Sequence, residues 1–75
     1  MKYLIDDDGL AINTAQITAV RFKPNKNDGS YKNNREYPFI ADIFVLDREK
    51  PFTVFFTEAQ ERELSRFMKD KENSA

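Results

Sequence analysis

The chain has 75 residues, with 12 Lys and Arg against 13 Asp and Glu, and a formal net charge of −1. It contains no Cys, no His and no Trp. These counts exclude disulfides, zinc sites built from Cys and His, and catalysis by a Cys nucleophile or an imidazole base. The length allows one small domain, residues 1–75, near the lower limit for a self-sufficient core.

The chain shows no targeting or membrane-spanning pattern. Only three consecutive apolar residues precede the acidic run at residues 6–8, too few for a signal-peptide core. The longest apolar stretch, residues 39–46, contains Asp42 and is far shorter than a membrane span. We therefore expect a cytoplasmic protein in a reducing compartment, with no membrane partner.

The first third of the chain resembles a short meander. A strand is expected at about residues 2–5, followed by a tight turn in the run Asp6-Asp7-Asp8-Gly9. Further strands are expected at about residues 10–12 and 17–22. In the last of these, alternation would place Thr18, Val20 and Phe22 on one side of the strand.

Residues 23–38 differ from the rest, because the segment holds four Asn, two Pro and almost no aliphatic residue. The pair Asp28-Gly29 is typical of a type I′ turn. The segment is expected to form a long hairpin tip or a mobile loop. Loops of this length without secondary structure are often functional or disordered.

Residues 39–47 and 52–56 predict a hairpin with a polar turn. A four-residue loop at residues 47–50 would segregate the side chains of the hairpin by face. One face would then carry Phe39, Ala41, Ile43, Val45, Phe52, Val54 and Phe56. The other would carry Ile40, Asp42, Phe44, Leu46, Thr53, Phe55 and Thr57.

A helix is expected from residue 58 to about residue 71. Thr57 and Gln60 match the capping box that starts a helix, and acids lie early and bases late along it, as the helix dipole favours. The chain as a whole predicts an α+β fold: a mostly antiparallel sheet of four or five strands with one C-terminal helix across a face. The sheet either stays open or rolls into a half barrel.

One helix covers only one face of a sheet, while both faces of the predicted hairpin carry large apolar side chains. The second face is the candidate interface, formed by Ile40, Phe44, Leu46 and Phe55. Either the meander closes over these residues, or a second copy or another protein covers them. We therefore expect a non-enzymatic interaction module, a homodimer or a protein that docks on a protein partner.

The segment 23–37 is also basic, with a net charge of +2 from four cations and two acids. Its cations and tyrosines would suit phosphates and bases, so nucleic-acid binding is the alternative function. The residues concerned are Lys23, Lys26, Tyr31, Lys32, Arg35 and Tyr37. A solubilising polar loop is the simpler interpretation, because the protein's pI of about 5.3 is acidic.

No pattern indicates an enzyme, a cofactor or a metal. The acids at residues 6–8 lack the alternate spacing of a calcium loop, so a solvated turn is expected there. Asp42 lies among apolar residues, and burial would raise its pKa. No His or nucleophile accompanies it, which favours a structural role.

The segment Gly9-Leu10-Ala11-Ile12-Asn13, followed by Ile17 and Val20, resembles the start of many short bacterial and phage proteins of unknown function. These proteins open with a strand, a G-x-x-I-N segment and an isoleucine-rich strand, and they close with a hairpin strand, a capped turn and a short helix. Residues 52–68 follow the closing pattern. The resemblance implies a small accessory module of sheet and helix, rolled like a pleckstrin-homology-type half barrel, without catalytic residues.

Overall fold

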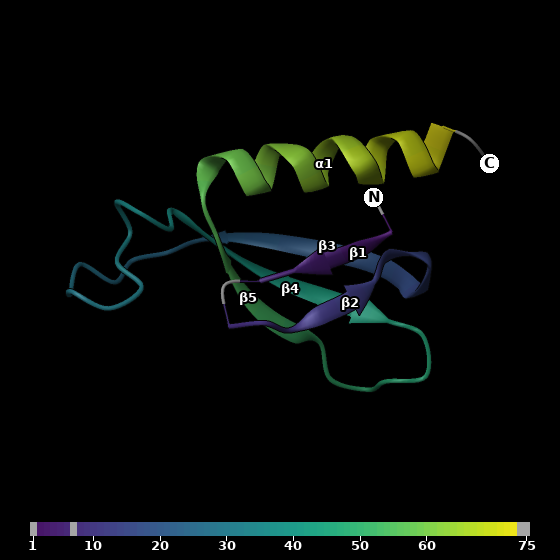
Figure 1. The fold of residues 1–75 in the computed structure, drawn as a ribbon, viewed down its shortest axis with the longest axis horizontal. Coiled ribbons are helices and arrows are strands. Elements are labelled where there is room, and N and C mark those ends of the chain that lie inside the picture. Colours follow the sequence, from purple (N-terminus) through teal and green to yellow (C-terminus); the bar gives the residue numbers. More distant parts are fainter. Residues whose placement is uncertain (1, 7, 74–75) are drawn as a thin grey trace.

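The computed structural model describes residues 2–6 and 8–73, with side chains up to residue 71. It confirms the α+β class: five short strands precede one C-terminal helix (Figure 1). In chain order the elements are β1 (Tyr3–Ile5), β2 (Ala11–Asn13), a 3-10 turn (Thr14–Gln16), β3 (Ile17–Pro24), β4 (Phe39–Val45), β5 (Phe52–Phe56) and α1 (Glu58–Asn73).

The strands form two antiparallel sheets rather than one. β1 pairs with β2 in a two-stranded sheet, and β3, β4 and β5 follow one another in a three-stranded sheet. In the β4–β5 hairpin, Ala41 lies opposite Val54 and Ile40 opposite Phe55, which confirms the segregated register. Alternate residues of the same strands therefore supply two chemically different faces.

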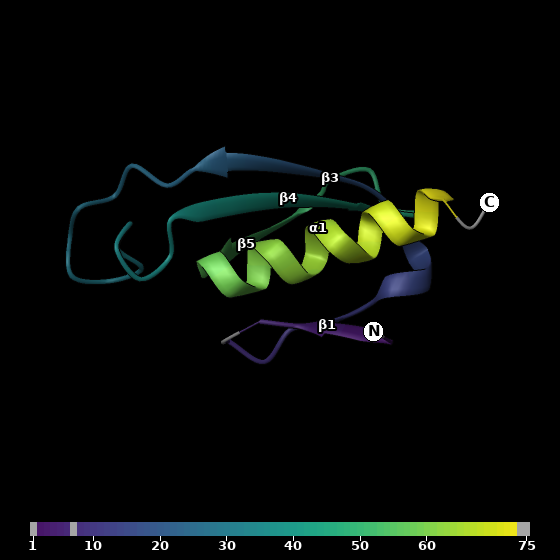
Figure 2. The same ribbon diagram turned by 90° about the horizontal axis from the view of Figure 1, so that it is seen from above.

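The core lies on only one of these faces, here called the inner face. Its buried side chains include Ile43 and Phe56 of the sheet, Leu4 and Ile12 of the hairpin β1–β2, and Leu64 of α1. The hairpin and the helix thus cover the same side of β3–β4–β5, as the view from above shows (Figure 2). The meander does not close over the opposite, outer face, so no half barrel forms from the described residues.

β3 differs from the expected strand in two ways. It extends to Pro24, and a bulge between Ile17 and Ala19 inserts Thr18 as an unpaired residue. The bulge places Ile17, rather than Thr18, in the core with Val20 and Phe22. The expected alternation is therefore wrong at Thr18, because one inserted residue shifts the side chains that precede it.

Local side-chain bonds set the turn of the hairpin β1–β2 and the start of the helix. The Asp6 carboxylate accepts hydrogen bonds from the amides of Asp8 and Leu10, and Gly9 has a φ of +88°. The helix begins with the expected capping box: the Thr57 hydroxyl accepts from the Gln60 amide, and the Gln60 side chain accepts from the Thr57 amide. Asp7, part of the acidic run, lies outside the described residues.

Candidate functional site

The candidate interface residues lie on or next to the outer face. Ile40 and Phe55 are directly opposite across β4 and β5, and Phe44 lies farther along β4 on the same face. These three side chains are half-buried, while Leu46, just after β4, is 56% exposed. No helix or strand in the described part of the chain covers this face (Figure 2).

Long cationic side chains from β3 lie over the same face. The Arg21 guanidinium is 5.9 Å from the centre of the Phe44 ring. The Lys23 ammonium is 3.1 Å from a carboxylate oxygen of Asp42, whose other oxygen accepts a bond from the Thr53 hydroxyl. The outer face therefore combines apolar side chains with charged groups and is not a purely apolar surface.

The pKa of Asp42 differs from the sequence-based expectation. The hydrogen bond from Lys23 holds the pKa of Asp42 below its ordinary value, against a smaller opposing effect of desolvation. The expected rise is wrong because the neighbouring strand supplies a cation that favours the ionised form. Asp42 therefore carries a negative charge at neutral pH, in an ion pair within the sheet.

The loop between β3 and β4 is held by its asparagines. Asn25 is buried, and its amide nitrogen donates to the carbonyls of Lys32 and Tyr37. The Asn27 side chain accepts from the Gly29 amide and donates to the Tyr31 carbonyl. The expected type I′ turn at residues 28–29 is wrong, because neither residue has the positive φ that this turn requires.

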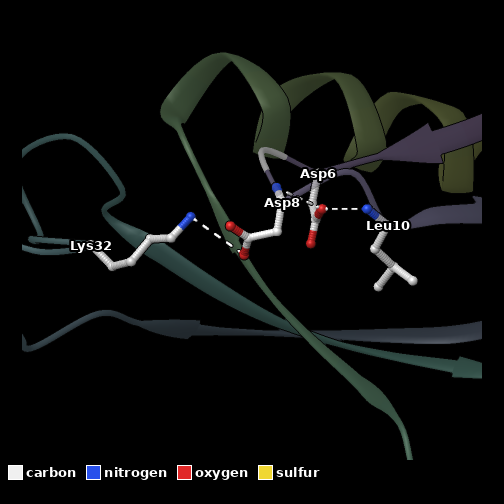
Figure 3. A network of polar contacts seen from close by, with 4 residues as sticks. All are labelled: Asp6, Asp8, Leu10 and Lys32. Carbon is white, nitrogen blue, oxygen red and sulfur yellow. Dashed lines mark hydrogen bonds and ion pairs between the residues drawn. The ribbon is translucent and has the colours of Figure 1, made fainter.

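Lys32 connects this loop to the rest of the molecule. Its ammonium is 4.8 Å from the centre of the Tyr37 ring and 5.9 Å from that of Phe55. It also lies 3.8 Å from an Asp8 oxygen in the turn between β1 and β2, in front of β5 (Figure 3). Because the Lys32 side chain is only 12% exposed, it acts as a link between the loop and the turn.

The six residues singled out for nucleic-acid binding therefore fall into two groups. Lys23 is paired with Asp42, Lys32 is withdrawn from solvent, and the Tyr37 side chain is half-buried. The remaining three are exposed on the loop: Lys26, Tyr31 and Arg35. The loop does not bring all six to one surface.

Sequence reasoning missed a groove between β3 and α1. It has a volume of about 520 Å³ and is lined by Val20 and Phe22 of β3 and by Met68 and Lys69 of α1, among others. The alternating apolar residues of β3 were visible in the sequence. The sequence did not show that α1 lies across the groove from them, because the position of α1 along the sheet depends on tertiary packing.

Among the described residues, which exclude Asp7 of the acidic run, no cluster of three or more potential metal-ligating side chains occurs. Among the same residues, no helix is both long and apolar enough to cross a membrane. Comparisons with known protein families, with curated proteins and with solved structures gave no match. Function must therefore be argued from the surfaces described above.

Proposed function

We propose that this protein is a small, non-enzymatic interaction module that associates with a second copy of itself through the outer face of β3–β4–β5. One observation carries the proposal: no helix or strand of the described residues packs as a second layer on the large side chains of this face, although sheets normally have one on an apolar face. Leu46, which is 56% exposed beside Phe44, extends the apolar surface beyond the sheet.

The charges of this face suit a symmetric pair. A two-fold axis parallel to β4 would place β3 of one copy over β5 of the other. Arg21 and Lys23 would then meet the uncharged row of Thr53 and Phe55, so the cations of the two copies would not face each other. The two Asp42 carboxylates would lie near the axis, each neutralised by Lys23 of its own copy. The Phe44 side chains of the two copies would lie near the axis.

The size of the face predicts weak association. Three strands about 4.8 Å apart and seven residues at about 3.4 Å each give a flat footprint of roughly 340 Å² per copy. Stable interfaces bury about 800 Å² per partner, so the pair is expected to form at high concentration and separate on dilution. This suits a module whose assembly depends on its local concentration.

Solution mass by light scattering across a concentration series tests the proposal. The mass should rise from 8.8 kDa toward twice that value. Leu46→Asp, at an exposed position, should keep the protein monomeric, and Phe44→Asp should do the same. Ile5→Asp is the matched control, because Ile5 is 60% exposed on β1, away from this face. A mass of 8.8 kDa at every concentration would rule out self-association.

Nucleic-acid binding through the loop is the second candidate, supported by the exposure of Lys26, Tyr31 and Arg35 on a loop held in shape by Asn25. The probe is a labelled single-stranded oligonucleotide, and its binding would be measured by fluorescence anisotropy at several salt concentrations. Two phosphate contacts predict a slope of about −1.4 in log affinity against log salt. Lys26→Ala with Arg35→Ala should abolish binding, whereas Lys2→Ala with Lys50→Ala, equal in charge, should not.

A further inference from the structure

The outer edge of β3 has hydrogen-bonding groups that no described strand uses. β3 is the first strand of the sheet order β3-β4-β5, so only one of its edges is paired. At the end of the ladder, the Asn25 amide donates to the Pro38 carbonyl at 2.9 Å. Antiparallel pairing alternates along a strand, so the backbone groups of Val20, Phe22 and Pro24 point away from β4.

Pro24 supports this assignment of the edge. Proline has no N–H and is tolerated in sheets where that side of the strand faces outward. At the opposite end of β3, the Lys71 ammonium of α1 donates to the Ile17 carbonyl at 2.7 Å. The edge available to another strand therefore lies between Ile17 and Pro24, with Val20 and Phe22 at its centre.

The groove beside this edge receives side chains from the same residues. Val20 and Phe22 point to the inner face and line the groove together with Met68 and Ser65 of α1. Its volume of about 520 Å³ is in the range of ligand clefts, roughly 300–1,000 Å³. A strand paired with β3 would place every second side chain in this groove.

The charges around the edge select the partner. Arg21 and Lys23 lie on the outer face of β3, a strand without acidic residues, and Lys23 is paired there with Asp42 of β4. Among the described residues, the groove lining includes two lysines, Lys69 and Lys71, but no acid. An antiparallel copy of β3 would bring Arg21 and Lys23 close to their own copies, and like charges across strands are destabilising. A strand with acids on its outer face would be complementary to them.

We propose that the edge of β3 and the groove beside α1 bind an extended segment of another protein in which apolar and acidic residues alternate. The apolar side chains would enter the groove beside Val20, Phe22 and Met68. The acidic side chains would lie beside Arg21 and Lys23, and main-chain hydrogen bonds would extend the sheet. This site is distinct from the outer face, since it uses the edge of the sheet.

The probe is a synthetic peptide of seven residues with blocked ends, Glu-Val-Glu-Val-Glu-Val-Glu. Its binding to the protein would be measured by calorimetry. We expect binding that is at least tenfold stronger than that of the peptide with Lys in place of Glu. The valines would pair with Val20 and Phe22, so N-methylation of the valines should abolish binding. N-methylation of the glutamates, whose amides would face away from β3, is the matched control and should be tolerated.

Variants of the protein locate the site. Val20→Pro removes an outward N–H without removing a bond to β4, and it should weaken peptide binding about tenfold relative to Val20→Ala. Arg21→Gln with Lys69→Gln should weaken it about three- to tenfold. Lys26→Gln with Arg35→Gln, which removes the same charge from the loop, should leave it unchanged. Circular dichroism would verify that each variant is folded.

Several outcomes would overturn the proposal: no binding at millimolar peptide, equal binding of the Glu and Lys peptides, or equal damage from both N-methylations. If the protein bound no peptide but formed a dimer that Val20→Pro dissociated, the edge of β3 would pair with a second copy. That result would also overturn the proposal. Leu46→Asp separates this site from the proposed dimer face, since it should affect the solution mass and leave peptide binding intact.

Discussion

The inner and outer faces of the three-stranded sheet are formed by alternate residues of the same strands, yet they are stabilised in different ways. On the inner face, Ala41, Ile43 and Phe56 are completely buried under the hairpin and the helix. On the outer face, Phe44 and Phe55 are half-buried, and the nearest cover consists of cationic side chains such as Arg21.

The difference shows that strand pattern alone does not decide which face becomes the core. Both faces of β4 and β5 carry phenylalanine, but only one receives Leu4, Ile12 and Leu64 from other elements. Burial of apolar area is the dominant favourable term in folding, so most of the stability should come from the inner face. The outer face should contribute through local charge pairs.

Replacement of neighbouring phenylalanines offers the strongest test of this comparison. Phe56→Ala should cost about 3–5 kcal/mol, because it leaves a cavity in the core. Phe55→Ala on the outer face should cost only about 1 kcal/mol, because its ring is half-buried. Urea unfolding measures both. A domain of this length has a stability of roughly 4–11 kcal/mol, so Phe56→Ala is expected to be close to unfolding. Equal costs would contradict the comparison.

Asn25→Asp should have an intermediate effect. The substitution replaces the amide that donates to the carbonyls of Lys32 and Tyr37 by a carboxylate that repels them. We expect a loss of about 1–3 kcal/mol and faster amide hydrogen exchange across residues 25–38. Asn33→Asp is the matched control: its side-chain oxygen accepts from the amides of Arg35 and Glu36, a role that a carboxylate retains. Only a long hydrogen bond of 3.5 Å from its amide nitrogen to the Ser30 carbonyl would be lost.

The ion pair of the outer face should give the smallest effect, with a definite dependence on pH. Because the pKa of Asp42 is lowered in the folded protein, its contribution is present above the ordinary value of 3.8 and is lost as the pH falls through the lowered pKa. Wild type and Asp42→Asn should therefore differ in unfolding free energy at neutral pH and converge in acid. In a double-mutant cycle with Lys23→Met, additive effects would show that the pair does not couple.

Local chemistry made much of the fold predictable. The capping box at Thr57 and Gln60 and the segregated register of the hairpin β4–β5 follow from residue type and spacing, and both are confirmed. The division into two sheets, with the hairpin β1–β2 on the same side as the helix, was not predictable. It depends on packing between segments that are distant in sequence.

The candidate surfaces were less predictable than the fold. The sequence placed Ile40, Phe44 and Phe55 on one face, but it did not reveal that Arg21 and Lys23 would lie across them. The bulge at Thr18 also gives no clear sequence signal, although it determines which residues of β3 reach the groove beside α1. Long-range pairing decides both features.

The link formed by Lys32 and Asp8 has a consequence for aggregation. β5 is the outermost strand on the other side of the sheet, and its sequence, Phe-Thr-Val-Phe-Phe, is uncharged and rich in residues that favour cross-β assembly. The Lys32 ammonium lies between this strand and the β1–β2 turn, next to Phe55. A charge at this position should oppose fibril formation, since a further β5 stacked on this edge would have to displace the link between Lys32 and Asp8.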